Sequence, residues 1–501
     1  MLYEISKMKS ILLPGLCCAV LPTVETLAQK NKSDKPNIIY ILADDMGYGD
    51  IGILGQRLIK TPNIDRLARD GMIFTRHYAG APVSSPSRCS LMTGVHTGHT
   101  LIRGNKKVPG VGALPIDHSV MTTPEAIKVN TDYVTGMSGR WHLGEEKSPD
   151  QTPYRRGFDY HFGKLSSDYA NKDFGVMYDT LWHKDGRHVP YDDYSKIGIE
   201  PVYENGKLYN LNKQELAQRP INLDKLVTQK AVSFIENNKN RNFFLYVAYC
   251  LPHAPMQFHE NTPPTAYLNE IWNPLERAFA SMVQALDSYV GMIVEQVDKL
   301  GLSDKTLIIF ASDNGAHYEG GHDYRFFKSN GPFNGIKRDL IEGGIHVPMI
   351  VRWTNTIKAG TQTNHLSAFW DIMPTVCELA GAPIPAQTDG ISFAPTLTGK
   401  GKQRQHEYLY WEFSEHPTVA WGHKAPKPNW PRQTVIFDDH WKVIHYVDEE
   451  KTEVYDLSKD ITEGYDLSLQ RPDIMQRGLS IMKKAHTPND NYPLLKSERK
   501  K

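Results

Sequence analysis

The sequence predicts an α/β protein with a mostly parallel central sheet, followed by a smaller region with antiparallel strands. Three continuous apolar runs, at 37–43, 243–248 and 306–311, are typical of strands buried on both faces of a parallel sheet. A long helical pattern at 272–300 lies between the last two runs. Strands that alternate with helices favour a doubly wound α/β fold, in which ligands gather at the carboxyl ends of the strands.

The N-terminal half contains the patterns of a first strand and a first helix. Acidic residues follow the apolar run at 37–43 directly. Residues 61–71 place Ile64, Leu67 and Ala68 on one side of a helix, and a glycine ends the pattern. We therefore expect a strand whose end carries carboxylates, with an amphipathic helix after it.

The pattern at 272–300 predicts a long amphipathic helix. Its apolar positions include Phe279, Met282, Leu286 and Val290. This spacing places them on one face, which we expect to pack on the sheet.

Residues 383–402 are rich in Pro, Thr and Gly and indicate a boundary. Beyond it, 408–411 and 441–446 alternate between apolar and polar residues like antiparallel strands. We therefore predict a main domain at 29–399 and a smaller α+β subdomain at 400–501. The charged tail from Lys496 is expected to fray.

The N-terminus has the features of an export signal. Lysines precede an apolar run at 11–22 that is too short to span a bilayer, and small residues before Gln29 indicate cleavage after residue 28. We expect a periplasmic or secreted protein without a stable membrane span. A lipid anchor at Cys17 or Cys18 has little support, because Leu16 is not small.

The balanced charge, with 57 basic and 57 acidic residues, argues against a nucleic-acid-binding protein. Any recognition of anions must therefore be local. The widely spaced Cys89, Cys250 and Cys377 do not form a disulfide framework pattern.

Two pairs of oxygen-bearing residues follow predicted strands. Asp44-Asp45 comes after the first strand, and Asp313-Asn314 comes after the strand at 306–311. Such residues also cap turns, but two pairs at two strand ends can converge across a parallel sheet. Oxygen ligands suit a hard cation such as Ca²⁺ or Mg²⁺. A dinuclear zinc site would need histidine ligands near these acids. The sequence next to the two pairs has no histidine at the matching positions, so we do not expect such a site.

The most informative segment is Ser84-Ser85-Pro86-Ser87-Arg88, which runs on into Leu91-Met92-Thr93-Gly94. A serine hydroxyl is a weak nucleophile unless a base, a metal or a chemical modification activates it. If a helix begins here, Arg88 lies one turn after Ser84 and faces the same side. Taken alone, the segment is better explained as a turn in which Ser84 or Ser87 caps a helix.

The segment 81–94, together with the upstream Asp pair, resembles the type I sulfatases of the alkaline phosphatase superfamily. Several other segments match that family's motifs in the same order along the chain. They are Gly139–Gly144, Arg156–Asp159, Leu251–Pro255, Gly335–Lys337 and Glu342–Pro348, with weaker likeness at Asp371–Thr375 and Tyr455–Leu457. The resemblance covers nearly the whole chain after residue 36. It implies an alkaline-phosphatase-like α/β fold and a sulfuric ester hydrolase.

The resemblance also implies the cofactor chemistry. In the family, the first residue of the pentapeptide is oxidised to formylglycine, whose hydrate attacks sulfur. By position this residue is Ser84, and a serine-type maturase would be a partner. Calcium would be held by Asp44, Asp45, Ser84, Asp313 and Asn314.

The sulfate pocket implied by the resemblance contains fixed cations and two histidines. Arg88, Arg140 and Lys337 would surround the tetrahedral anion. His142 would contact the formylglycine hydroxyl. His253, with Lys337, would protonate the leaving alcohol.

Two positions depart from the family pattern. Arg140 stands where most members have Lys, and an arginine stays charged and cannot serve as a proton donor. We therefore interpret Arg140 as an electrostatic clamp on sulfate. His346 replaces an Arg before Val-Pro, and we expect it to be structural.

The predicted substrate is a sulfated carbohydrate, such as a host or algal glycan. Aromatic residues in 169–194 and 416–432 could stack on sugars or anchor loops, while His96, His99 and Arg103 could reach substrate hydroxyls or neighbouring carboxylates. Two alternatives remain: a phosphoesterase of the same superfamily that uses unmodified Ser84, and a catalytically silent glycan-binding homologue.

Overall fold

The computed structural model describes residues 35–105, 113–144, 152–165, 202–209, 223–254, 256, 267, 269–415 and 431–499. The predicted export signal at 1–28 lies outside these residues. Within the described ranges, none of the helices combines the length and the apolar character that a membrane span requires.

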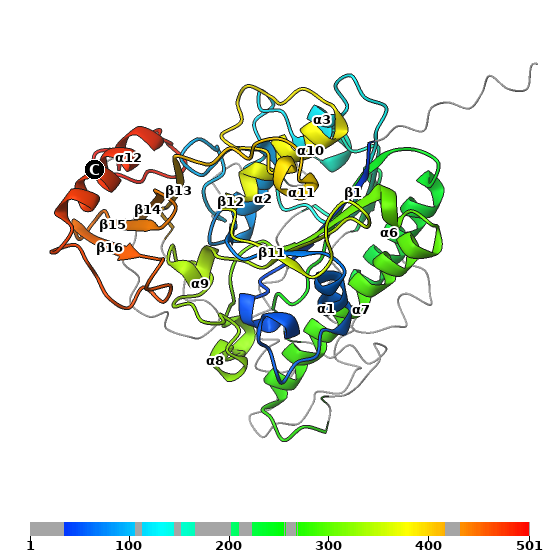
Figure 1. The fold of residues 1–501 in the computed structure, drawn as a ribbon, viewed down its shortest axis with the longest axis horizontal. Helices are drawn as coiled ribbons and strands as arrows, with labels where there is room; N and C mark the ends of the chain where they lie inside the picture. Colours follow the sequence, from blue (N-terminus) through cyan, green and yellow to red (C-terminus); the bar gives the residue numbers. More distant parts are fainter. Residues whose placement is uncertain are drawn as a thin grey trace, which may run out of the picture. The chain divides into compact units, whose positions relative to one another are not determined.

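A ten-stranded mixed sheet forms the centre of the molecule (Figure 1), in the order β11-β2-β10-β9-β1-β8-β4-β5-β6-β7. Its strands are β1 Asn37–Ala43, β2 Met72–Phe74, β4 Val134–Arg140, β5 Tyr160–Lys164, β6 Tyr203–Glu204, β7 Lys207–Leu208, β8 Phe243–Ala248, β9 Thr306–Ser312, β10 Met349–Arg352 and β11 Thr361–Thr363. The middle of the sheet is parallel, since β9, β1, β8, β4 and β5 pair in the same direction. The prediction of a mostly parallel sheet is therefore confirmed, and β10 is an antiparallel insertion between β9 and β2.

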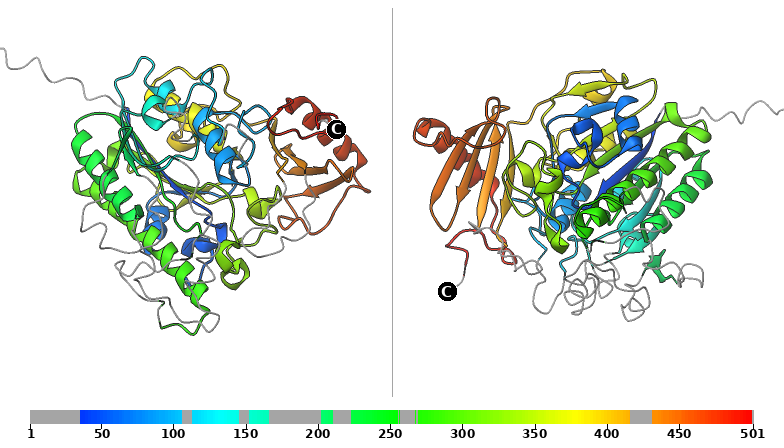
Figure 2. Two further views of the ribbon diagram at one scale, coloured as in Figure 1. Left: turned by 180° about the vertical axis from the view of Figure 1, so that it is seen from behind. Right: turned by 90° about the horizontal axis from the view of Figure 1, so that it is seen from below.

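Helices cover both faces of this sheet, as the two views of Figure 2 show. The helices α1 Pro62–Arg69, α6 Leu223–Asn238 and α7 Pro274–Lys299 pack on one face, where Ile39 and Ile41 of β1 point. The helices α2 Ser84–Thr93, α3 Thr123–Ile127 and α10 Ile372–Ala380 pack on the other face, with Ile38, Tyr40 and Leu42. This two-sided burial explains the continuous apolar runs in the sequence.

A separate four-stranded antiparallel sheet follows the main sheet in the chain. Its strands are β13 Tyr408–Phe413, β14 Arg432–Phe437, β15 Trp441–Tyr446 and β16 Lys451–Asp456. One face carries helix α12 Pro472–Ala485, and the other packs on the main body through Trp411, Trp370 and Tyr78. The predicted antiparallel C-terminal sheet is confirmed, whereas the domain division at residue 399 stays a prediction.

Short elements connect the two sheets. They are β3 His77–Tyr78, β12 Ser367–Ala368, α8 Tyr324–Phe327, α9 Glu342–Ile345 and α11 Ala394–Thr398. Strands β3 and β12 pair with each other, and α9 lies beside the C-terminal sheet (Figure 1). The second half of the chain is thereby tied to the region that precedes α2.

Candidate active site

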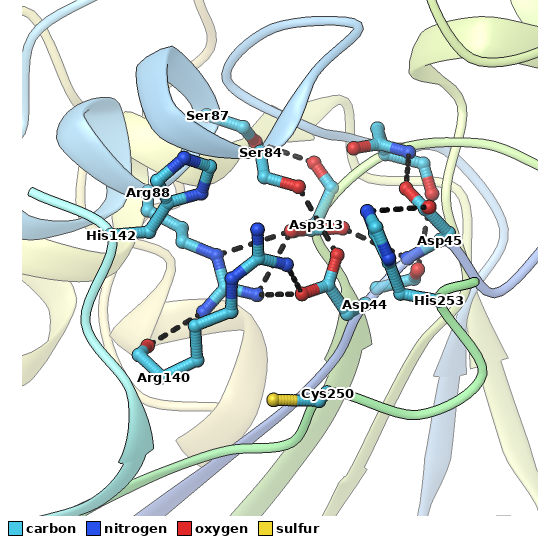
Figure 3. Close-up of polar contacts among 12 residues, drawn as sticks. Asp44, Asp45, Ser84, Ser87, Arg88, Arg140, His142, Cys250, His253 and Asp313 are labelled. Carbon is cyan, nitrogen blue, oxygen red and sulfur yellow. Dashed lines mark hydrogen bonds and ion pairs between the residues drawn. The ribbon is translucent and has the colours of Figure 1, made fainter. Parts of the chain in front are cut away.

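The residues that we predicted as the site converge at the carboxyl ends of the central strands (Figure 3). Asp44 and Asp45 follow β1, and Asp313 follows β9. The pairing of Ala43 with Ser312 places these two strand ends side by side. Arg140 is the last residue of β4, the strand on the other side of β8.

The acidic residues form one buried cluster. Asp44, Asp45, Asp313 and Asn314 all have no exposed surface. The Asp45 amide donates to Asp313 Oδ1 at 3.1 Å, and Asn314 Nδ2 donates to Asp45 Oδ1 at 2.8 Å. Asn314 Oδ1 is buried and has no hydrogen-bond partner among the described residues, so an acceptor oxygen remains available in the cluster.

The proposed nucleophile lies at the start of α2, directly above this cluster. Ser84 is 1% exposed, and its Oγ donates to Asp44 Oδ1 at 3.1 Å. Ser87, one turn along, donates to the Asp313 carbonyl at 2.6 Å. The helix is thus anchored to both acidic strand ends, and Gly94 ends it in a left-handed conformation (φ 72°).

Three cations surround the acids. Arg88 donates from Nη2 to Asp44 Oδ2 at 2.9 Å and to Asp313 Oδ2 at 3.0 Å. Arg140 forms a short ion pair with Asp44. Lys337 Nζ lies 2.7 Å from Asp45 Oδ2. The predicted one-turn spacing therefore does bring Arg88 to the side of α2 on which Ser84 lies.

The surrounding charges and burial shift the pKa values of Asp44 and Asp313 in opposite directions. Burial alone would raise the pKa of Asp44, but Arg140 and Arg88 outweigh it and hold that pKa well below the ordinary value. Burial and the neighbouring Asp44 charge raise the pKa of Asp313 to about 7, although Arg88 opposes them. The three cations thus neutralise Asp44 more completely than Asp313, and a further cation beside Asp313 would favour its ionised form.

The donor set fits a calcium ion. Three carboxylates, the unpartnered Asn314 Oδ1 and the Ser84 position supply oxygen atoms, which hard cations prefer. The expectation that histidines are missing near the acids is wrong in space, however. His253 Nε2 lies 3.5 Å from Asp45 Oδ2, and His317 joins Asp45 and Glu319 in a second potential ligand group. Oxygen atoms still dominate around Ser84.

The two predicted catalytic histidines differ in their surroundings. His142 contacts the nucleophile segment through its backbone, since its carbonyl accepts from Ser85 Oγ at 2.9 Å. Its buried Nδ1 has no hydrogen-bond partner among the described residues, and its backbone has a positive φ of 60°. Burial, Arg140 and Arg88 lower the pKa of His142 well below the ordinary value. Burial and then Lys337 lower that of His253, against the pull of Asp45.

A carboxylate that the sequence analysis missed lies among these groups. Glu319 Oε2 is 2.9 Å from Lys337 Nζ and 3.8 Å from His253 Nε2, and its other oxygen pairs with Arg338. Burial alone would lower the pKa of Lys337, but Asp45 and Glu319 raise it, so the ammonium is retained. Glu319 and His317 continue the loop that begins with Asp313, and this continuity was the available signal.

The other candidate residues lie elsewhere or outside the described part. His99 Nδ1 is 2.9 Å from Asp389, and Arg103 donates to Glu412 and to backbone carbonyls. These two residues therefore reach neighbouring carboxylates. His346 is structural, as expected, because it bridges Glu342 and the Thr75 carbonyl. The aromatic segment 169–194 and most of 416–432 fall outside the described residues.

Comparison with known proteins agrees with this geometry. The sequence model of the family described as Sulfatase matches residues 36–382, and that of the N-sulphoglucosamine sulphohydrolase C-terminal region matches residues 332–477. Arylsulfatase G of Rattus norvegicus is 34% identical over 432 residues, which cover 80% of this chain and 76% of that protein. N-acetylgalactosamine-6-sulfatase of Mus musculus is 31% identical over 468 residues, which cover 86% and 82%.

Solved structures show the same similarity in three dimensions. Ps i-CgsB in complex with k-i-k-neocarrahexaose superposes with a TM-score of 0.72 at 28% identity, covering 90% of this chain and 92% of that chain. A glycosaminoglycan-metabolism protein of Bacteroides thetaiotaomicron superposes with a TM-score of 0.68 at 25% identity, covering 90% and 99%. The fold around the acidic cluster is therefore shared with these proteins.

Proposed function

This chain belongs to the sulfatase family, whose members are sulfuric ester hydrolases, and from this premise we propose that it removes sulfate from carbohydrates with a formylglycine made from Ser84 and with Ca²⁺. One observation carries the proposal. The Ser84 hydroxyl is buried at a helix start, 3.1 Å from Asp44, where three acids and three cations converge. A serine in an ordinary helix cap has no need of such surroundings.

The residues that would hold calcium are Asp44, Asp45, Asp313, Asn314 and the modified Ser84. Bound there, the ion would neutralise negative charge on the sulfate and fix the position of the nucleophile. Asn314 Oδ1, which has no hydrogen-bond partner among the described residues, supports this assignment, because a buried amide oxygen without a partner costs free energy unless a ligand uses it.

The formylglycine would supply a geminal diol whose one hydroxyl attacks sulfur and whose other hydroxyl later releases sulfate. Forming it removes two hydrogens from the Ser84 side chain, so a separate serine-type maturase must accept two electrons and two protons. Maturation of this buried position fits an enzyme that acts on the chain before it folds.

Arg88 and Arg140 would bind and orient the sulfate group. Both guanidiniums reach Asp44 and therefore lie beside Ser84, where a tetrahedral anion must be held during attack. Arg140 has this position although the family usually has a lysine there. An arginine fits a clamp, because its planar fork stays charged and offers two parallel donors.

His253 and Lys337 would handle the proton of the leaving alcohol. They share Asp45 and Glu319 as neighbours, so one network holds both groups. When the S–O bond to the sugar breaks, the departing oxygen keeps the electron pair and needs a proton, which a protonated His253 would donate from Nε2 with Lys337 beside it. Glu319 would keep Lys337 protonated and hold it in place.

A carbohydrate substrate is supported by two comparisons. The similar N-acetylgalactosamine-6-sulfatase is named for a sulfated amino sugar, and Ps i-CgsB was solved in complex with k-i-k-neocarrahexaose. We propose that this chain acts on sulfated glycans of the same general class, after export directed by residues 1–28.

The test combines mass spectrometry with turnover. Protein produced with a serine-type maturase should yield a tryptic peptide 77–88 lighter by two hydrogens, and it should release sulfate from at least one sulfated mono- or disaccharide. Ser84→Ala should abolish release while the fold remains. Ser90→Ala is the matched control, since that buried hydroxyl on the same helix has no partner among the described residues.

Two outcomes would contradict the proposal. Full activity in protein whose Ser84 is intact would exclude the formylglycine. Release of phosphate but not sulfate from matched sugar esters would favour the phosphoesterase alternative, for which the histidines near Asp45 are the structural argument.

A further inference from the structure

An exposed group of aromatic and apolar side chains lies on loops that follow the same strands as the acidic cluster. We call it the aromatic rim patch, and it consists of Leu58, Ile271, Trp272 and Phe326. Leu58 is 43% exposed, Phe326 is 41% exposed and Ile271 is fully exposed. Leu58 lies between β1 and α1, Ile271 and Trp272 lie between β8 and α7, and Phe326 lies in α8 after β9. Because β1, β8 and β9 are parallel, the patch lies at the edge of the sheet that holds Asp44 and Asp313.

The rings of this patch are held in place by other aromatic side chains. The Trp272 ring lies 5.6 Å from that of Tyr267 in a nearly parallel arrangement, and it makes edge contacts with Phe326 and Phe327 at 5.6 and 5.4 Å. The Tyr267 hydroxyl accepts from the Lys60 amide at 2.8 Å. Because these rings are already held in place, the protein would lose little side-chain entropy when a ligand stacks on them.

Buried rings connect the patch to the candidate active site. The Phe327 ring contacts that of His322 at 6.1 Å, and His322 contacts His317 at 5.5 Å. His317 in turn faces His253 at 6.4 Å, and His253 lies 3.5 Å from Asp45. A series of ring contacts in the interior thus joins the acidic cluster to the residues beneath the exposed patch, so the patch and the site share one rigid support.

Exposed cations accompany the patch. Arg57, Lys60 and Lys328 lie on the same loops, and Arg325 is 74% exposed beside its partner Asp323. Gln56 ties these loops together, because its Nε2 donates to both the Gly49 and Phe327 carbonyls. In a chain with 57 basic and 57 acidic residues, such a local group can attract a polyanion that the whole molecule would not.

From these observations we propose that the aromatic rim patch and its cations bind the polysaccharide chain that carries the sulfate ester. The inference rests on the proposed function, since it names where the rest of that substrate lies. Pyranose rings present apolar C–H faces that stack on aromatic rings, and their sulfate groups pair with exposed arginine and lysine. The two components together distinguish a sulfated sugar polymer from other polyanions.

The binding test uses dextran sulfate as the probe and unmodified dextran and polyphosphate as comparisons. Ser84→Ala protein is used throughout, so no turnover occurs and failure of the proposed chemistry cannot affect the result. Binding is measured by retardation in gels that contain each polymer. We expect retardation by dextran sulfate and none by dextran.

Aromatic variants separate stacking from charge. Trp272→Ala and Phe326→Ala should each weaken binding to dextran sulfate about fivefold to tenfold, the effect of losing a modest apolar contact area, and should leave polyphosphate binding unchanged. Tyr465→Ala is the matched control, because Tyr465 is 63% exposed in the C-terminal region. Trp272→Phe should retain most of the binding, which guards against misfolding of the alanine variant.

Charge variants test the second component. Arg57→Ser and Lys60→Ser should each weaken binding to dextran sulfate and polyphosphate by about twofold to fivefold at low salt, and the difference should shrink as salt rises. Lys483→Ser on α12 is the control for an exposed lysine elsewhere. Equal loss in the controls, or unchanged dextran sulfate binding in Phe326→Ala protein that melts like the parent, would overturn the proposal.

Discussion

Two buried ionic clusters in this molecule have opposite characters. The acidic cluster around Asp44 leaves Asn314 Oδ1 and His142 Nδ1 without hydrogen-bond partners among the described residues. The cluster around Lys442, in the C-terminal sheet, is called the closed cluster, because its one lysine pairs with two buried carboxylates, although Glu463 Oε1 has no hydrogen bond of good geometry among the described residues. Lys442 Nζ lies 2.8 Å from Glu342 and 2.8 Å from Glu463. The first cluster is arranged to receive a ligand, and the second is arranged to hold two parts of the protein together.

The closed cluster connects to the active site through the backbone. Glu342 also accepts from Tyr78 at 2.9 Å and lies 2.7 Å from His346. The glycines that follow it pack directly on the catalytic loops, since Gly343 donates to the Asn334 carbonyl at 2.6 Å and the Gly315 amide donates to the Gly344 carbonyl at 3.0 Å. Both the acidic cluster and the Lys442 cluster are buried and charged, so buried charge alone does not mark a catalytic site. What distinguishes the acidic cluster is the hydroxyl of Ser84, a candidate nucleophile 3.1 Å from Asp44.

Removal of calcium should have the largest effect on the open cluster. Exhaustive chelation should reduce sulfate release to background, because the carboxylates would then hold no metal ion to neutralise the sulfate and fix the nucleophile. It should also lower the melting temperature, since a ligand at a hundred times its dissociation constant stabilises the fold by about 2.7 kcal/mol. Calorimetry and a turnover assay with restored Ca²⁺ check both effects.

Asp313→Ala should imitate chelation, and added Ca²⁺ should not restore its activity. The control is Asp323→Ala, an exposed carboxylate that follows the same strand but only pairs with Arg325. Undiminished turnover in thoroughly calcium-free protein would remove the metal from the proposed mechanism.

Arg140 offers a second test within the open cluster. Arg140→Ala removes a charged donor from a buried site and should reduce the rate of sulfate release by about 10²–10³. The stability should change less, because Asp44 keeps Arg88 as a partner. Arg140→Lys should keep substantial activity, since it restores the residue that the family usually has.

A reversed pattern would change the conclusion. If the natural protein is inert on every sulfated sugar and Arg140→Lys gains activity, the guanidinium blocks the pocket. The catalytically silent alternative would then be the better description.

Much of the fold could be predicted because burial on both faces leaves a plain signal. Strands β1, β8 and β9 are continuous apolar runs and were found from the sequence. Strand β4 was missed, because its sequence contains two glycines and two hydroxyl residues. Gly139 is needed there, since a Cβ would lie 1.9 Å from the Ala248 carbonyl oxygen. Because the neighbouring backbone leaves no room for a side chain at this position, the strand lacks the continuous apolar run that marks β1, β8 and β9.

The site was predictable only as far as motifs and strand ends reach. Asp44 and Asp313 could be placed together because each follows a buried strand. Glu319 and His317 continue the loop after Asp313, but this continuity alone could not assign them to the site, because polar residues in a loop have the composition of an exposed surface. Only the folded chain brings Glu319 to Lys337, 18 residues away, and to His253 from another strand.

Breaking the closed cluster should lower the free energy of unfolding. Lys442→Met would leave Glu342 and Glu463 buried without their cation, and breaking a buried pair costs about 3–5 kcal/mol. Urea unfolding should show this loss. Lys451→Met, which removes a half-exposed lysine of the neighbouring strand, should cost less than about 1 kcal/mol. A Lys442→Met variant as stable as the parent would show that the two clusters do not differ as we argue.

The smallest expected effect concerns a third network, which joins the C-terminal region to the loop after α2. His486 lies 2.6 Å from both Glu412 and Glu498, and Glu412 also pairs with Arg103. Burial alone would lower the pKa of His486, but the two carboxylates outweigh it and raise the pKa above the ordinary value. The stabilisation is therefore fully present below about pH 6.5 and is lost as pH rises through the raised pKa.

His486→Gln should reduce the urea midpoint at pH 6, and the difference in midpoint from the parent should shrink steadily at higher pH. His440→Gln, a histidine without a carboxylate partner among the described contacts, should show no such trend. Because this network contains a titratable link and the Lys442 cluster contains a permanently charged one, a pH-independent effect of His486→Gln would mean that the imidazole contributes through packing instead of charge.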